Sequence, residues 1–111
     1  MNSEGKRAVE IAKRLIGTPY RIGGDAPGGF DPPGFVHYCY KKVGVSLPKS
    51  YPKLINMGKA VLQNELQVGD LVFTHSFYVG LYVGDNYFIH ASNRGVIITV
   101  VPYFYTGRRV T

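Results

Sequence analysis

The sequence is poor in the groups from which most metal sites and disulfide frameworks are built. Its 111 residues include one cysteine, Cys39, three histidines, seven Asp or Glu residues and no tryptophan. A single cysteine excludes an intramolecular disulfide and any zinc site built from several cysteines, so we expect neither a metal nor a cofactor. No apolar run approaches the ~20 residues that a membrane helix needs, and no membrane span is expected.

The length and composition are those of an ordinary globular domain. With 45% apolar residues, a chain of 111 residues supports one hydrophobic core, and we expect residues 1–111 to form a single domain. The net charge of +6 favours anionic partners such as wall polymers or lipid head groups. Nucleic acid is not expected, because no nucleic-acid-binding motif is present. The polar start MNSEGKRAVE is followed by no apolar segment of the signal-peptide type.

Helical patterns come first along the chain and strand patterns follow. Apolar residues at three- and four-residue spacing predict a helix over residues 4–16, with Ser3 as N-cap and Gly17 as its end. A second helix is expected over residues 33–43 and a short one over 54–62. The stretch RIGGDAPGGFDPPG is too rich in Gly and Pro for regular structure, and SLPKSYPK is expected to be a loop. Strands are predicted over residues 70–73, 78–83, 87–90 and 96–101. This order predicts an α+β domain with helices packed on one side of a small antiparallel sheet.

Five blocks carry a resemblance to a known family. They are GTPYRIGG, GFDPPGFVHYCYKKVGVSLPKS, LQVGDLVF, YVGLYVGDNYFIHAS and GVIITVV. In order and spacing they resemble the NlpC/p60 family of bacterial cell-wall cysteine peptidases, over nearly the whole chain. The resemblance implies a papain-like α+β fold. It also implies cleavage of peptidoglycan peptides, usually beside D-glutamate, by a Cys nucleophile, a His base and a third polar residue.

The sequence departs from the family pattern at the catalytic positions. The family's Phe-Asp-Cys-Ser-Gly motif appears here as FDPPG at residues 30–34, so the nucleophile position is Pro32. The family's His-Val-Gly block appears as YVG at residues 78–80, so the base position is Tyr78. Only the third catalytic position keeps a matching residue, His90. A Gln that the family often carries falls on Leu54.

These replacements predict a domain without the family's activity. A proline at position 32 removes the thiol, and it also removes a backbone N–H expected to face the oxyanion. A tyrosine hydroxyl is a poor base at neutral pH. Because a nucleophile and its base act as a unit, losing both removes nearly all covalent catalysis.

Substitute catalytic residues are weaker interpretations. Cys39 follows Pro32 by seven residues, about two turns or ~10 Å along the same helix, and a free cysteine is usually buried in a core. His75 is expected to be a loop residue, and His37 lies within the second helix. A cell-wall cysteine-type peptidase that uses such non-standard residues remains the alternative.

The resemblance also implies that some ligand-binding positions of the family keep matching residues in this sequence. Tyr20 and Asp31 match family positions that recognise the stem peptide and its free amine, while Tyr78 and His90 would line the same cleft. Three of them also have a purely structural interpretation: Tyr20 as a packed aromatic, Asp31 as a turn former before proline, and His90 as a buried polar residue with its hydrogen bonds satisfied.

We therefore expect an inactive domain that binds peptidoglycan stem peptides or γ-glutamyl peptides in a targeting or regulatory role. A protein-interaction scaffold with a filled cleft is the second alternative. Basic residues of the first helix, together with Arg108 and Arg109, are expected on solvated faces that would favour an anionic wall polymer. The resemblance implies a cell-wall or extracellular location, which the polar N-terminus does not support.

Overall fold

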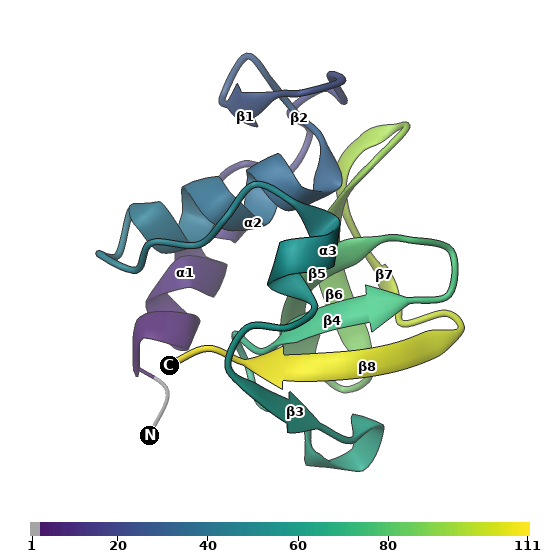
Figure 1. The fold of residues 1–111 in the computed structure, drawn as a ribbon. Helices are drawn as coiled ribbons and strands as arrows, with labels where there is room; N and C mark the ends of the chain where they lie inside the picture. Colours follow the sequence, from purple (N-terminus) through teal and green to yellow (C-terminus); the bar gives the residue numbers. More distant parts are fainter. Residues whose placement is uncertain (1–2) are drawn as a thin grey trace.

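The two long helices lie in the first half of the chain, and all strands of the main antiparallel sheet lie in the second (Figure 1). The computed structural model describes residues 3–111. The helical elements are α1 (Ser3–Lys13), α2 (Pro32–Lys41), α3 (Tyr51–Leu54) and the 3₁₀ turn η1 (Gln63–Glu65). The strands are β1 (Asp25–Ala26), β2 (Gly29–Phe30), β3 (Lys59–Val61), β4 (Leu71–Thr74), β5 (Val79–Gly84), β6 (Tyr87–Ser92), β7 (Gly95–Val100) and β8 (Phe104–Arg109). The expected α+β class is confirmed.

A six-stranded sheet forms one layer of the molecule. Its strand order is β3-β8-β4-β5-β6-β7, and every neighbouring pair is antiparallel. Strands β4 to β7 follow one another through short turns. At the β5–β6 turn, Asp85 and Asn86 take left-handed φ angles of 54° and 65°, which these two residue types tolerate well.

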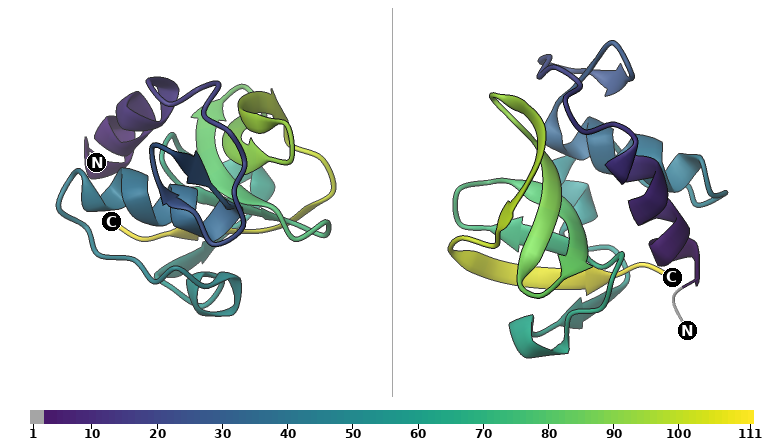
Figure 2. Two further views of the ribbon diagram at one scale, coloured as in Figure 1. Left: turned by 90° about the horizontal axis from the view of Figure 1, so that it is seen from above. Right: turned by 180° about the vertical axis from the view of Figure 1, so that it is seen from behind.

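The two long helices cover one face of this sheet (Figure 2). Helix α2 packs on α1 and on strands β5 and β6. The main core lies between these layers and contains Val9, Phe35, Leu81 and Ile89 among its fully or nearly fully buried residues. Side chains alternate along a strand, so Phe88 belongs to a smaller cluster on the other face, with Val72 and Val101.

The structure corrects the boundaries of both long helices, including the end of α2, which lies at Lys41 and not at Val43. Helix α1 ends at Lys13, three residues before the predicted end, because Arg14 and Leu15 donate to carbonyls three residues back instead of four. Ser3 lies inside the helix and does not precede it. Helix α2 begins at Pro32, one residue before the prediction, and Asp31 is its N-cap.

The predicted helix over residues 54–62 is wrong. A short helix, α3, lies earlier and begins within SLPKSYPK, which was expected to be a loop throughout; the Ser50 hydroxyl accepts a hydrogen bond from the Lys53 N–H and caps it. Gly58, with a φ of +60°, lies against the Arg109 backbone, and residues 59–61 then pair with β8 as strand β3. Long-range pairing overrides the local helical pattern here.

Two further strand features differ from the sequence prediction, and the expectation that RIGGDAPGGFDPPG lacks regular structure is wrong. The Gly- and Pro-rich stretch forms a small hairpin, β1–β2, which lies over the start of α2 (Figure 2). Strand β8 has a polar sequence without clear alternation, yet it lies between β3 and β4 in the sheet. Among residues 3–111, no helix has both the length and the apolar character to cross a membrane.

Candidate functional site

The N-terminus of α2 offers no free backbone donor. Its first two residues, Pro32 and Pro33, have no N–H. The Gly34 N–H donates to the Asp31 Oδ1 (2.8 Å), and the Phe35 N–H donates to the Asp31 backbone carbonyl (2.9 Å). A helix usually presents its first N–H groups to anions. Here every one of them is either missing or already bonded, so this helix end has no donor left for an oxyanion.

The loop before α2 is folded tightly over this helix end. The second carboxylate oxygen of Asp31 accepts from the Gly23 N–H (3.1 Å), and the Asp31 N–H donates to the Gly24 carbonyl (3.0 Å). A side chain at Gly34 would collide with that same carbonyl. Asp31 is therefore a cap and a loop anchor as well as a candidate ligand residue.

Tyr20 lies next to this group with its ring partly open to solvent. It forms an isolated parallel bridge with Phe30, the residue before Asp31, and its side chain is 40% exposed. The structure thus brings Tyr20, Asp31 and Pro32 together at the start of α2. These are three positions that the resemblance assigns to one cleft.

Tyr78 and His90 form a second group, on the sheet. Two hydrogen bonds hold Tyr78 just before β5: its N–H donates to the Thr74 Oγ1 (3.2 Å) and its carbonyl accepts from the Thr74 N–H (3.1 Å). The rings of Tyr78 and His90 are in contact, with centroids 5.0 Å apart. The position opposite His90 is Gly80, where a side chain would meet the His90 Cβ.

His90 is buried and only partly hydrogen-bonded. Its Nε2 lies 3.1 Å from the Thr99 Oγ1, and its ring stacks on Phe88 with centroids 4.2 Å apart. Its Nδ1 is buried without a hydrogen-bond partner among the described residues. Burial lowers the pKa of His90 to about 4, so the imidazole is neutral at pH 7. The resemblance assigns the third catalytic position to His90 and the base position to Tyr78, and in this structure the two residues meet through their rings.

The depressed pKa of His90 predicts a loss of stability in acid. Between pH ~6.5 and about 4 the unfolded chain binds a proton that the folded chain does not, so the free energy of unfolding falls as the pH drops. The loss is expected to reach roughly 2–3 kcal/mol by pH 4. Denaturant unfolding at a series of pH values measures it. His90→Gln should flatten the profile. An NMR midpoint near 6.5 for His90 would contradict this assignment.

The two groups are not in direct contact, because α2 packs on the face of β5 and β6 that carries Leu81 and Ile89, whereas His90 shares the other face with Phe88. Helix α2 lies on β5 and β6, but no hydrogen bond or ring contact within residues 3–111 joins Tyr20 or Asp31 to Tyr78 or His90.

The Cys39 thiol is fully buried in the main core, and burial raises its pKa, which opposes nucleophilic reactivity.

The remaining sequence candidates have structural surroundings of their own. His75 is exposed in the β4–β5 turn, edge-on to Tyr105, and the His37 Nδ1 is within hydrogen-bond distance of the Leu47 carbonyl. Leu54 is fully buried in the main core.

Sequence reasoning missed two neighbours of His90 and misread one arginine. Phe88 is two residues before His90 on the same strand face, a spacing that could have identified it; Thr99 depends on the β6–β7 register. Arg109 was expected on a solvated face. Instead it forms two hydrogen bonds to the buried Asp70, at 2.9 and 2.8 Å. No local pattern links these two residues, which lie 39 positions apart.

Comparison with known proteins gives the family. The model of the NlpC/P60 family matches residues 17–111. A probable endopeptidase of Mycobacterium tuberculosis H37Rv is 38% identical over 101 residues, covering 89% of this chain and 26% of that protein. The NlpC homologue of Haemophilus influenzae, also named a probable endopeptidase, is 35% identical over 109 residues, covering 96% of this chain and 60% of that protein.

Solved structures agree with the sequence comparison. The NlpC/p60 domain of the peptidoglycan hydrolase SagA superposes with a TM-score of 0.89 at 29% identity, covering 96% of this chain and 98% of that one. An NlpC/P60 protein from Bacillus cereus gives a TM-score of 0.87 at 30% identity, covering 95% of this chain and 39% of that one. The expected NlpC-type fold is confirmed, and the chain belongs to the NlpC/P60 family.

Proposed function

We propose that residues 1–111 act as one catalytically inactive NlpC/P60 domain, which binds peptidoglycan stem peptides or related γ-glutamyl peptides without cleaving them. Its role would be targeting or regulation. The observation that carries the proposal is the start of α2, where Pro32 and Pro33 stand in place of a thiol and its neighbour and the next two N–H groups are already bonded.

Catalysis by the family's route needs three things that this site lacks. It needs a thiolate, a base to form it and N–H donors for the oxyanion. Pro32 supplies neither a thiol nor an N–H. Tyr78 stands at the base position, with its ring against a neutral His90. Loss of any one of these would slow the reaction, and their joint loss removes covalent catalysis.

Binding needs less, and the groups for it are present. Tyr20 offers a ring that is 40% exposed beside the start of α2. Asp31 uses each carboxylate oxygen once, for the Gly34 and Gly23 N–H groups, and each oxygen keeps a second lone pair that can accept from a ligand amine. The substrate class comes from relatives: one of them, 36% identical over 113 residues that cover 88% of this chain and 60% of that protein, is the murein DD-endopeptidase MepS of Escherichia coli K12.

The two alternatives, a peptidase with non-standard residues and an interaction scaffold, require different properties of the site. A peptidase with non-standard residues needs a reactive thiol, and the buried Cys39 with its raised pKa opposes that role. An interaction scaffold needs no peptide affinity at all. Binding of a stem peptide without cleavage separates the proposal from both.

A titration with matched variants tests the binding proposal. A stem tripeptide with a free N-terminal L-Ala is added to isotope-labelled protein, and NMR shifts are expected to cluster on Tyr20, Asp31, Tyr78 and His90. Tyr20→Ala should weaken binding about tenfold, because it removes the exposed ring. Asp31→Asn should weaken it similarly by removing the charge, while asparagine still caps α2.

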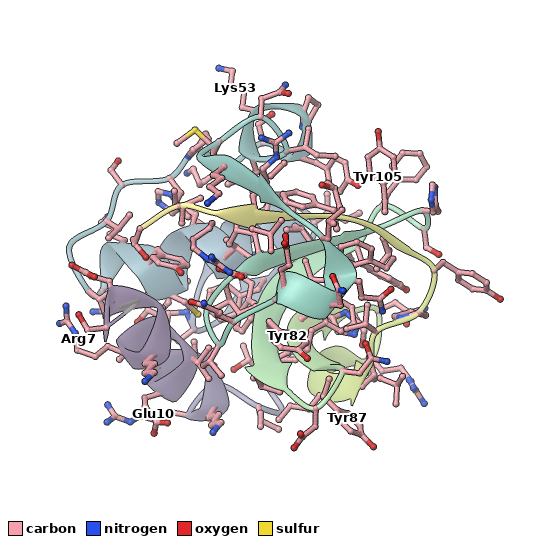
Figure 3. All side chains as sticks on the ribbon, turned by 90° about the horizontal axis from the view of Figure 1, so that it is seen from below. Arg7, Glu10, Lys53, Tyr82, Tyr87 and Tyr105 are labelled. Atoms are coloured by element: carbon pink, nitrogen blue, oxygen red, sulfur yellow. The ribbon has the colours of Figure 1, made fainter. Side chains whose placement is uncertain are left out.

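Tyr87→Ala is the matched control, since Tyr87 is comparably exposed (43%) but lies at the β5–β6 turn (Figure 3). Unchanged affinity in both Tyr20→Ala and Asp31→Asn would overturn the assignment of this site.

A further inference from the structure

A hollow lined by aromatic rings lies beside the turn that carries Tyr78, and the proposed function does not use it. Its volume is about 290 Å³. We call it the aromatic hollow; its lining residues are Tyr51, Ile55, Thr74, His75, Phe77 and Tyr105. They come from three places in the chain: the helix α3 with the residue after it, the end of β4 with the turn that follows it, and strand β8.

Hydrogen bonds fix the walls of the hollow in place. The Tyr51 hydroxyl donates to the Thr74 carbonyl (3.3 Å), which also accepts from the Phe77 N–H (3.1 Å). The His75 N–H donates to the Tyr103 carbonyl (2.9 Å) and so ties the turn to the segment before β8. These bonds mean that the hollow exists before any ligand arrives, which lowers the cost of binding.

The rings are arranged as two edge-to-face pairs. Tyr51 and Phe77 have centroids 5.9 Å apart with planes at 66°, and His75 and Tyr105 have centroids 4.9 Å apart with planes at 65°. Figure 3 shows Tyr105 projecting on the same side of the molecule as Lys53 of α3, away from Arg7 and Glu10 of α1. Among these rings, Phe77 is 75% exposed and Tyr105 is 54% exposed, so a ligand in the hollow can reach both.

Phe77 is held there in an unfavourable conformation. Its φ is +66°, in the left-handed region that a bulky side chain rarely adopts, and its side chain is 75% exposed. An exposed phenylalanine gains little from burial to offset such strain. Backbone strain of this kind persists mostly where it serves a site.

The lining selects a neutral ligand. None of its six residues is a carboxylate, and the chain carries a net charge of +6, so a cation would meet ring faces but no counter-ion, against the positive field of the whole chain. The lining also has no Lys or Arg, so a phosphate or carboxylate would lack its usual partners. Tyrosine rings and hydroxyls suit a ligand with an apolar face and a polar edge.

We propose that the aromatic hollow binds a neutral pyranose ring, namely an N-acetylated amino sugar of the glycan strand that carries the stem peptides. The C–H face of the sugar would lie on the rings of Phe77 and Tyr105, and its hydroxyl groups would meet the Tyr51 and Tyr105 hydroxyls. The choice of glycan rests on the proposed function, since the same polymer supplies both ligands.

Two probes separate this proposal from the peptide site. N-acetylglucosamine trisaccharide contains glycan without peptide, and the stem tripeptide contains peptide without glycan. We expect the trisaccharide to shift NMR signals of Phe77, Tyr105 and Ile55, with a dissociation constant on the order of a millimolar, while the signals of Tyr20 and Asp31 stay in place. If the peptide does not bind, the proposed function fails but the sugar result is unaffected. If the trisaccharide does not bind, the sugar site fails but the peptide result is unaffected.

A pair of glycine variants provides the decisive comparison. Phe77→Gly removes the ring and relieves the left-handed strain, so the protein should stay folded with an equal or higher Tm while sugar affinity falls about tenfold. Tyr103→Gly is the matched control: Tyr103 is also left-handed (φ 48°) and 76% exposed, but it does not line the hollow, and its variant should keep full affinity.

Three results would overturn the sugar site. They are no shifts at the hollow with 10 mM trisaccharide, affinity retained in Phe77→Gly, or equal losses in the two glycine variants. Stronger binding of choline or of a free aromatic amino acid than of the trisaccharide would equally reject a sugar as the ligand.

Discussion

Pro32→Cys, Pro33→Ser and Tyr78→His, combined in one chain, are expected to give a domain that cleaves the stem tripeptide. Cysteine returns both a thiol and a backbone N–H at the first position of α2, and serine returns the N–H at the second. A histidine at position 78 would lie against His90, whose buried Nδ1 could then accept or donate the bond that orients the new imidazole. Cleavage, followed by mass spectrometry, should exceed that of the Pro33→Ser/Tyr78→His control on the order of 100-fold.

Recovery is expected to be partial. Leu54, fully buried in the main core, stands where the family often has a Gln, and the Gly34 N–H stays bonded to Asp31. Circular dichroism and thermal unfolding establish that the triple variant is folded. A folded triple variant with no more activity than its control would mean that the cleft itself has been remodelled.

Arg109→Met is expected to destabilise the protein more than any surface substitution, by about 3–5 kcal/mol. Asp70 is fully buried, and Arg109 supplies two of its hydrogen bonds, through Nε (2.9 Å) and Nη2 (2.8 Å). A third bond, from the Gln67 N–H (2.8 Å), would remain. Removing the guanidinium therefore leaves a buried carboxylate without its counter-charge. Chemical denaturation measures the loss, and Tm should fall by roughly 10–20 °C.

A surface ion pair serves as the control. Lys49 and Asp25 are 2.7 Å apart, and their side chains are 53% and 39% exposed. Lys49→Met should lower the free energy of unfolding far less than Arg109→Met does, since solvent screens this pair. Similar losses for the two variants would show that the Asp70–Arg109 pair contributes no more than a surface contact.

The fold class could be read from the sequence because its signals are local. The helical spacing of residues 8–16 and the β-rich runs after residue 68 each predict their element without reference to the rest of the chain. What failed depends on distant partners. Strand β3 exists because residues 59–61 pair with β8, and the polar sequence of β8 gives no sign of this pairing.

In the candidate site, too, features that are local in the sequence could be predicted, and features that depend on distant residues could not. The losses at Pro32 and Tyr78 are visible as residue types at motif positions, so the sequence alone predicts them. The capping of α2 by Asp31 depends on the folded geometry, as does the burial that lowers the pKa of His90 to about 4, so neither can be predicted from residue types alone. The aromatic hollow could not be predicted, because Tyr51, Phe77 and Tyr105 come from three separate segments and no motif joins them.

The central claim is that the domain binds the stem tripeptide without cleaving it. Its most direct test is to incubate the unsubstituted domain with the stem tripeptide at equal concentrations, and to follow binding by NMR and peptide mass by mass spectrometry in the same sample. We expect saturable shifts at Tyr20, Asp31, Tyr78 and His90 and no product above the buffer control. A new peptide product would contradict an inactive domain, and its loss in Cys39→Ala would assign the chemistry to the one thiol in the chain.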